Sequence, residues 1–247
     1  MISFGVDVGG SGAKGAPVDL DTGKLLAKRF RLRTPRPATP GSVIETIRSI
    51  VEHHAWRGPV GVTIPGVVVH GVVRSATNFD AGWDGFDARR IMSDQLGVPV
   101  TVLNDADSAG LAEIRYGGHN AKEGVVLVLT FGTGIGSALF HDGVLIPNTE
   151  FGQLEFRGVT AEEYAAGRLI KRDRRDIEWW ATHANEFLNH MDSILSPRLI
   201  IFGGGISKRF EEFDDVFDTR ADVVPARLRN NAGIVGAAMT AATEERE

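Results

Sequence analysis

The first stretch of the chain alternates short apolar runs with turn residues, a pattern typical of β-strands. The run ISFGVDVGG ends in glycines and is followed by GAKGAPVDLDTG and then by KLLAKRFRLRTP. Three such runs separated by turn signals predict a meander of adjacent strands. The next segment, RTPRPATPG, is rich in proline and predicts a connector, with Ser42 as the cap of the helix after it.

Helix and strand patterns then alternate. Val43, Ile47 and Ile50 fall on one face of the helix that follows the connector. PVGVTIPG predicts a strand, and VPVTVLND predicts a buried strand that ends in Asn104 and Asp105. A further helix is expected in DADSAGLAEIRYG, directly after these two polar residues.

The second half of the chain repeats the opening pattern. GVVLVLTFGTGIGSALFHDGVL predicts a strand, a glycine-rich turn, a second strand and a turn that contains aspartate, like DVGGSGAKGAPVDLDTG near the start. This echo indicates a two-lobed α/β protein. Later, RLIIFGGG predicts a central buried strand, and AGIVGAAMTAA predicts a helix of small residues packed closely against another element.

The helix near residues 176–196 has the clearest amphipathic pattern, and Pro197 ends it. Its predicted buried face consists of Ile177, Trp180, Ala181, Ala184, Phe187, Leu188, Met191, Ile194 and Leu195. We expect a small N-terminal lobe of residues 1–110 plus 232–247 and a larger C-terminal lobe of residues 111–231. The last helix would thus cross back to the first lobe.

Composition removes several classes of function. The 247 residues carry a formal net charge of −5, which does not favour nucleic acid or an anionic membrane. The chain has no cysteine, which excludes disulfides, thiolate metal sites and thiol nucleophiles. No apolar run approaches the roughly 20 residues of a membrane span, and the N-terminus lacks the regions of a signal peptide. These features together predict a cytoplasmic protein.

Glycine-rich turns follow apolar strands at three places. Residues 10–15, GSGAKG, match the dinucleotide fingerprint, but Pro17 and a strand pattern follow where a Rossmann motif needs a helix. The loop is therefore predicted to be a hairpin, and no P-loop motif occurs. Turns of this kind can aim backbone amides at phosphate, although a tight turn alone would also require glycine. The candidate phosphate-binding residues are Gly9, Gly10, Ser11, Gly12 and Lys14 in the first turn, Thr133 and Gly134 in the second, and Gly203, Gly204 and Gly205 in the third.

Two acidic residues end predicted strands. Asp7 could hold Mg²⁺ directly or through water, or could cap a turn. Asp105 could accept a proton from a substrate hydroxyl, with Asn104 beside it to bind sugar oxygens. Either Asp105 or Asp107 is expected to cap the following helix, which leaves the other acid available. Further along, Glu150 and Gln153 offer polar groups that suit vicinal hydroxyls, or they lie in an exposed loop.

Taken together, these motifs resemble the ROK family of sugar kinases, which belong to the hexokinase and actin-like ATPase superfamily. The residues from Asp7, DVGGSG, resemble its first phosphate motif, and those from Leu129, LTFGTGIG, its second. IIFGGG resembles the adenosine motif, and LNDAD contains the catalytic aspartate. Within the family the chain is most similar to the actinobacterial polyphosphate glucokinases, notably in TPRPATPGSV, TNFDAGW and VVPARLRNNAGIVGAA.

The resemblance implies a ribonuclease H-like fold of two α/β lobes around a central cleft, and a role for each motif. Asp105 would deprotonate the 6-hydroxyl of glucose or a related hexose, and Mg²⁺ with polyphosphate or ATP would supply the phosphoryl group. The residues expected to contact the sugar are Asn78, Asn104, Asp105, Glu150, Gln153 and Glu162. A cationic track for polyphosphate would use Lys14, Arg168, Lys171, Arg172 and Lys208, although the KRDRR run could equally be a solvated surface. The family also suggests a homodimer.

Two departures from the family pattern bear on these expectations. Gln153 stands where the family has histidine, which affects sugar preference, and the cysteine-rich zinc motif is missing, so no zinc is expected. The alternatives are a hexokinase for glucose, mannose or another hexose that uses only ATP, and a non-catalytic sugar-binding or regulatory ROK protein. The regulators carry a helix-turn-helix before the first phosphate motif, and this chain has no room for one before Asp7.

Overall fold

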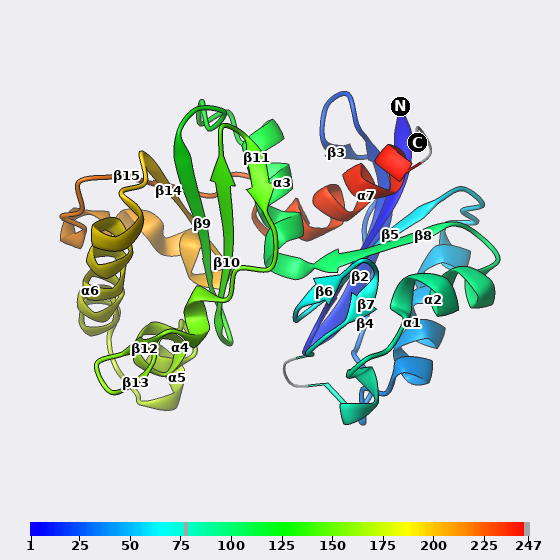
Figure 1. The fold of residues 1–247 in the computed structure, drawn as a ribbon, viewed down its shortest axis with the longest axis horizontal. Helices are drawn as coiled ribbons and strands as arrows, with labels where there is room; N and C mark the ends of the chain where they lie inside the picture. The colour runs from blue at the N-terminus through cyan, green and yellow to red at the C-terminus, as the bar shows by residue number, and fades with distance from the viewer. Residues whose placement is uncertain (77–78, 245–247) are drawn as a thin grey trace. The chain divides into compact units, whose positions relative to one another are not determined.

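The computed structural model describes residues 1–76 and 79–244, which form two compact units (Figure 1). Unit 1 consists of Met1–Ala112 and Asn231–Glu247, and unit 2 of Glu113–Asn230. The sequence places lobe boundaries at 110/111 and 231/232; that the lobes act as separate functional parts around a cleft stays a prediction. Among the described residues, no helix is long and apolar enough to cross a membrane.

Unit 1 is built on a six-stranded sheet of order β3-β2-β1-β5-β8, with β4 paired to β2. The strands are β1 (Ile2–Gly9), β2 (Gly12–Asp19), β3 (Lys24–Leu25), β4 (Phe30–Leu32), β5 (Val60–Ile64) and β8 (Val100–Asn104). The first strands form the predicted antiparallel meander, whereas β1, β5 and β8 run parallel. A small separate ribbon pairs β6 (Val68–Val69) with β7 (Val72–Val73).

Helices cover both faces of this sheet. Figure 1 shows α1 (Pro40–His53) and α2 (Ala88–Leu96) on one face and α7 (Ala232–Glu244) on the other. Helix α1 buries Ile44, Ile47 and Ile50 in the core, as its apolar spacing predicts. The predicted cap of α1 was wrong: the N-cap is Thr39, whose side chain accepts the N–H of Ser42, because Pro40 occupies the first helical position.

Helix α7 approaches the sheet closely because the residues at the contact are glycines. A Cβ on Gly5 of β1 would overlap the backbone of Ile234, and one on Gly61 of β5 would overlap the backbone of Ala237. The predicted small-residue helix therefore packs backbone against backbone on β1 and β5. It belongs to unit 1 although it follows unit 2 in the sequence.

Unit 2 repeats the sheet topology of unit 1. Its order is β11-β10-β9-β14-β15, with the first pairs antiparallel and the last pairs parallel. The strands are β9 (Val125–Phe131), β10 (Ile135–His141), β11 (Val144–Ile146), β14 (Leu199–Gly203) and β15 (Asp222–Pro225). The echo between the two halves of the sequence is therefore confirmed as a shared strand order.

Helix α6 (Ile177–Leu195) supplies most of the helical core of unit 2. Trp180, Phe187 and Met191 are fully buried, as predicted. The end of the predicted face was wrong, because Ile194 is 56% exposed. In its place Asp192 turns inward and accepts hydrogen bonds from Arg220, a residue far away in the sequence. The shorter elements of this unit are η2 (Phe151–Gln153), β12 (Glu155–Phe156), β13 (Val159–Thr160), α4 (Ala161–Ala165), α5 (Leu169–Arg172), η3 (Gly205–Glu212), η4 (Asp214–Val216) and η5 (Arg229–Asn231, which reaches one residue beyond the unit).

Packing of α7 on the sheet predicts the cost of a single methyl group. Gly61→Ala is expected to lower the free energy of unfolding by about 2–3 kcal/mol, because the methyl group meets backbone that cannot move aside. The matched control is Gly41→Ala in α1, where an added Cβ meets nothing within 4 Å. That variant should keep its stability or gain up to about 1 kcal/mol. Urea unfolding measures both, and equal stabilities for the two variants would contradict the close packing.

Candidate active site

Asp7 lies within β1, where partners on two neighbouring strands hold its carboxylate. Nζ of Lys14, the residue opposite on β2, is 2.9 Å from Asp7 Oδ2. The hydroxyl of Thr63, the neighbour on β5, donates to Oδ1 at 3.2 Å. The described partners of Asp7 are thus side chains of the sheet, so the alternative of a turn cap was wrong. A carboxylate of this kind can be one ligand of Mg²⁺ when water and phosphate oxygens supply the others.

The first glycine turn is a β-hairpin, as the sequence predicts. Strand β1 ends at Gly9 and β2 begins at Gly12, so Gly10 and Ser11 form the turn. The guanidinium of Arg31 on β4 lies against this turn, and its Nη2 donates to Ser11 O at 3.4 Å. Sequence reasoning did not single out Arg31. Its only signal was its place in a short strand whose register, Lys14 opposite Arg31, became visible with the fold.

Asn104 and Asp105 mark the transition from β8 to α3 (Asp105–Tyr116). The side-chain oxygen of Asn104 accepts the N–H groups of Ala106 at 2.7 Å and Asp107 at 2.9 Å. Its amide donates to Gly66 O at 2.9 Å, and only 4% of the residue is exposed. Asn104 therefore caps α3, and the expectation that Asp105 or Asp107 does so was wrong. A sugar contact of Asn104 stays a prediction.

This cap fixes the position of the candidate base. Asp105 is the first residue of α3, it is partly exposed, and its Oδ1 also accepts the N–H of Ala106 at 2.9 Å. The next acid, Asp107, is only 2% exposed. Of the two acids, Asp105 is the one that a substrate hydroxyl could reach.

The second glycine turn lies between β9 and β10 in unit 2, and residues 131–134 are called the donor loop below. Gly132 donates its N–H to Gly134 O at 3.0 Å, which closes the turn. Arg168 contacts the same loop twice, through its main-chain N–H to Gly132 O at 2.9 Å and through Nη1 to Thr133 O. The loop is therefore held from outside by one residue of the segment between α4 and α5.

The third glycine turn adjoins the donor loop. Strand β14 ends at Gly203, which is paired with Thr130 on β9. Gly204 has a φ of 88°, and a Cβ there would collide with the backbone of Phe131. The turn opens η3, a 3-10 helix with a kink at Arg209, rather than a regular α-helix. Unit 2 thus brings two of the three predicted phosphate turns side by side.

The candidate sugar residues of unit 2 gather at the beginning of β10. Glu150 and Gln153 flank Gly152, which packs against the carbonyl of Ile135. Glu162, on α4, places its carboxylate directly against Gly134. These elements therefore meet at two adjacent residues of the chain, although their contacts with a sugar stay predictions. Asn78 lies outside the described residues.

Most of the candidate cations are compensated by neighbouring acids. Lys14 pairs with Asp7, and Arg172 forms two contacts with Asp173 at 2.7 and 2.8 Å. The stretch 171–175 is exposed throughout, and so is Lys208. A polyphosphate track over these residues stays a prediction.

Farther along α3, Glu113 carries a buried carboxylate that is 1% exposed. Its Oε2 accepts the N–H of Arg227 at 3.0 Å, and Oε1 accepts that of Leu228 at 2.7 Å. Burial raises the pKa of Glu113, and the backbone donors oppose this shift. Nε2 of His119 is 3.8 Å from Oε2, and burial lowers the pKa of that imidazole. Sequence spacing could not reveal this contact, because Arg227 is distant in the chain.

The paired sheets and the structural comparisons first define the class of protein. The inorganic polyphosphate/ATP-glucomannokinase of Arthrobacter sp. strain KM matches with a TM-score of 0.94 and 47% identity, over 98% of this chain and 99% of that one. A ROK family glucokinase from Streptomyces griseus, in complex with glucose and AMPPNP, shares the fold with a TM-score of 0.83 and 24% identity, over 98% and 100% of the two chains. The fold is that of the actin-like ATPases, as predicted.

The family follows from the sequence comparisons. The ROK family model matches residues 3–151. The polyphosphate glucokinase of Mycobacterium tuberculosis (strain CDC 1551 / Oshkosh) is 52% identical over 242 residues, which cover 98% of this chain and 91% of that protein. The chain belongs to the ROK family, which confirms the resemblance inferred from its motifs.

The buried carboxylate of Glu113 predicts a pH dependence of stability. Its pKa is raised in the folded state, so its contribution is complete below the usual value of 4.5 and is lost as the pH rises through the folded value. The difference in unfolding free energy between the wild type and Glu113→Gln should therefore fall between pH ~4.5 and ~7.5. Urea unfolding at several pH values measures it.

Glu163→Gln provides a control of opposite sign. Hydrogen bonds from Thr160 lower the pKa of Glu163, so its contribution is present above pH 4.5 and is lost on acidification. A difference for Glu113→Gln that stays constant or rises with pH would show that burial does not govern this carboxylate.

Proposed function

We propose that this chain transfers the terminal phosphoryl group of inorganic polyphosphate or ATP to the 6-hydroxyl of glucose. The observation that carries the proposal is the 52% identity, over nearly the whole chain, to a polyphosphate glucokinase. The likeness to a polyphosphate/ATP-glucomannokinase supports the use of both donors. The glycine turns and the capped, partly exposed Asp105 are the features that such a reaction requires.

Asp105 is the proposed general base. Its carboxylate would take the proton of the 6-hydroxyl as the oxygen attacks the terminal phosphorus, and the shortened donor leaves as the P–O bond breaks. Asn104 would position this base through the cap of α3. In unit 2, Glu150, Gln153 and Glu162 would bind sugar hydroxyls, and the donor loop with Gly203, Gly204 and Gly205 would present N–H groups to the phosphates.

Asp7 is the proposed protein ligand of Mg²⁺. The described residues contain no group of three or more histidines and acids that could hold a metal by themselves. One carboxylate completed by donor phosphates and water is the usual arrangement for this cation in phosphoryl transfer, so Asp7 fits. When bound, Mg²⁺ would neutralise phosphate charge, and Lys14 at 2.9 Å would keep Asp7 in place.

Mannose is a second candidate acceptor. The glucomannokinase that resembles this chain favours it, and Gln153 replaces the family histidine within the proposed sugar site. We also propose that the protein is a cytoplasmic homodimer that needs no zinc. Size-exclusion chromatography with light scattering tests the dimer.

A panel of donors and sugars tests the proposed reaction. Purified protein with glucose, Mg²⁺ and nucleotide-free polyphosphate should form glucose 6-phosphate, which a coupled dehydrogenase assay detects. ATP should also serve as donor, and mannose as acceptor. Activity with ATP alone would support a hexokinase restricted to nucleotides, and no transfer with either donor would support a non-catalytic sugar-binding protein.

Asp105→Asn tests the base. It should lower kcat by about 10²–10⁴-fold, because a positioned base supplies that much of the rate. Glucose affinity, measured by calorimetry, should stay within a few-fold, since the amide keeps the size and one acceptor of the carboxylate. Asp94→Asn on α2, an exposed acid that pairs with Arg90 at 3.7 Å, is the control and should retain activity. Turnover like that of the wild type in Asp105→Asn would remove Asp105 from this role.

A further inference from the structure

The donor loop has carbonyl oxygens as well as N–H groups, and only the N–H groups attract phosphate. Arg168 binds two of these oxygens, since its main chain donates to Gly132 O at 2.9 Å and its Nη1 donates to Thr133 O. We propose that Arg168 is the positioning residue of the donor loop: it fixes the loop carbonyls so that the N–H groups face the donor phosphates. This inference rests on the phosphotransferase function proposed above.

The surroundings of Arg168 keep its side chain at the loop. Nη2 lies 4.0 Å from Oε1 of Glu162, and the guanidinium is only partly exposed. The Glu162 carboxylate also touches Gly134, so the two side chains enclose the loop from the same segment. The main chain of this segment follows closely, because a Cβ on Gly167 would lie 3.2 Å from the carbonyl of Phe131.

The same arrangement occurs at the first glycine turn, from a different element. In unit 1, Nη2 of Arg31 donates to Ser11 O at 3.4 Å, and Thr34 Oγ1 donates to Gly9 O at 2.5 Å. Arg31 lies on a strand, whereas Arg168 precedes a short helix. Side-chain donors on turn carbonyls in both units indicate a common physical requirement, namely that these oxygens be occupied where an anion is to bind.

This role separates the donor from the sugar. Loss of the guanidinium would free the Thr133 carbonyl and remove a positive charge beside the loop, and both effects weaken phosphate binding. The hydrogen bond from the main chain of Arg168 to Gly132 would remain, so the fold of the loop should survive. The sugar residues Glu150 and Gln153 are held by other contacts, such as the bond from Phe151 N to Ser137 Oγ at 3.0 Å.

Arg168→Met and Arg168→Lys test the proposal. Arg168→Met should weaken binding of polyphosphate and of a non-hydrolysable ATP analogue by about 10-fold or more, as expected for a lost hydrogen bond to a charged group. Arg168→Lys keeps the charge and one donor, and should recover part of that loss. Glucose KM should change less than about 2-fold in both variants, and the melting temperature should stay close to that of the wild type. Calorimetry gives the donor Kd, and steady-state kinetics gives KM and kcat.

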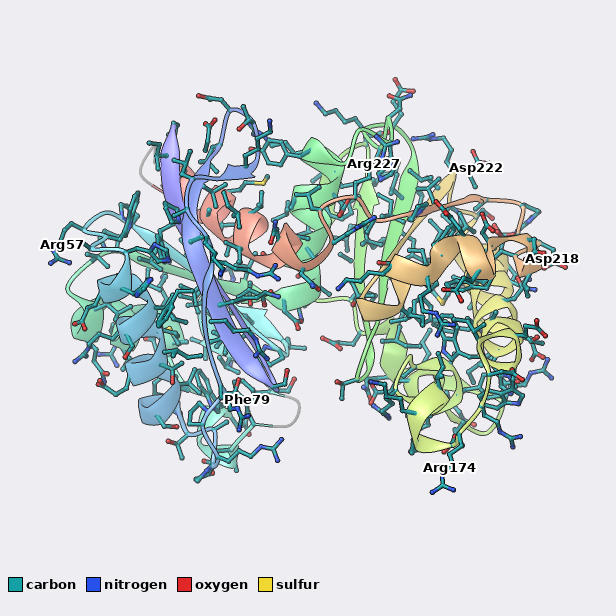
Figure 2. All side chains as sticks on the ribbon, turned by 180° about the vertical axis from the view of Figure 1, so that it is seen from behind. Arg57, Phe79, Arg174, Asp218, Asp222 and Arg227 are labelled. Carbon is teal, nitrogen blue, oxygen red and sulfur yellow. The ribbon has the colours of Figure 1, made fainter. Side chains whose placement is uncertain are left out.

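Arg174→Met is the matched control for charge and substitution type. Arg174 lies shortly after α5, and Figure 2 shows its side chain projecting away from the neighbouring helices. This variant should keep the donor Kd of the wild type. Equal losses in Arg174→Met and Arg168→Met would show that only net charge matters, and an unchanged donor Kd in Arg168→Met would overturn the proposal.

A second variant covers the case in which Arg168→Met does not fold. Gly134→Ala would push the Glu162 carboxylate and the loop apart, and it should raise the donor Kd while leaving glucose KM within a few-fold. A glucose KM that rises as much as the donor Kd would contradict the inference. Because donor binding is measured without turnover, the loop test remains decisive even if the wild type transfers no phosphoryl group, which is the outcome that refutes the proposed function.

Discussion

The packing of α7 against β1 and β5 is the constraint on which the rest of unit 1 depends. The helix can lie there only because glycines on both strands admit its backbone. Once seated, α7 brings Gly233 against the carboxylate of Asp7, and the carbonyl of Gly233 accepts the hydroxyl of Ser108 on α3 at 2.8 Å. One close contact thus fixes the strand of the candidate magnesium ligand and the helix of the candidate base together.

Glu113 extends this constraint to the other end of α3. The chain passes between the units after Ala112 and again after Asn230. Glu113 follows the first passage, and its carboxylate binds the backbone of Arg227 and Leu228, shortly before the second. A buried carboxylate is costly unless several donors satisfy it, so these two segments of the chain are held together as a pair.

Local chemistry made much of the fold predictable. Pro17 and the strand pattern after GSGAKG distinguished a hairpin from a Rossmann turn, and the hairpin is present. The apolar steps of α6 located its core face up to Met191. The errors lie where a distant residue decides. Asp192 is buried because Arg220 reaches it, and Ile194 is exposed in consequence of where the helix ends.

The candidate site shows the same division. The residue types and the strand ends that carry them were readable, since Asp7, Asp105 and the glycine turns each follow an apolar run. The cap of α3 was not, because Asn104, Asp105 and Asp107 are all good capping residues and only geometry selects among them. Arg31 gave no signal in its short strand, and the sequence marked Arg168 only as a charge for a cationic track, whereas the contact to Thr133 depends on how unit 2 folds.

Charge compensation explains why the glycine turns matter more than the number of basic residues. Lys14 faces Asp7, Arg168 lies near Glu162, and Arg172 is paired with Asp173. Little of this positive charge is left without a carboxylate nearby, so attraction of a phosphate chain has to come largely from oriented N–H groups and from Mg²⁺. Such groups recognise phosphate oxygens and make no demand on the adenosine of a nucleotide. A site built in this way can accept polyphosphate and ATP alike, because the two donors share the only part that the turns would contact.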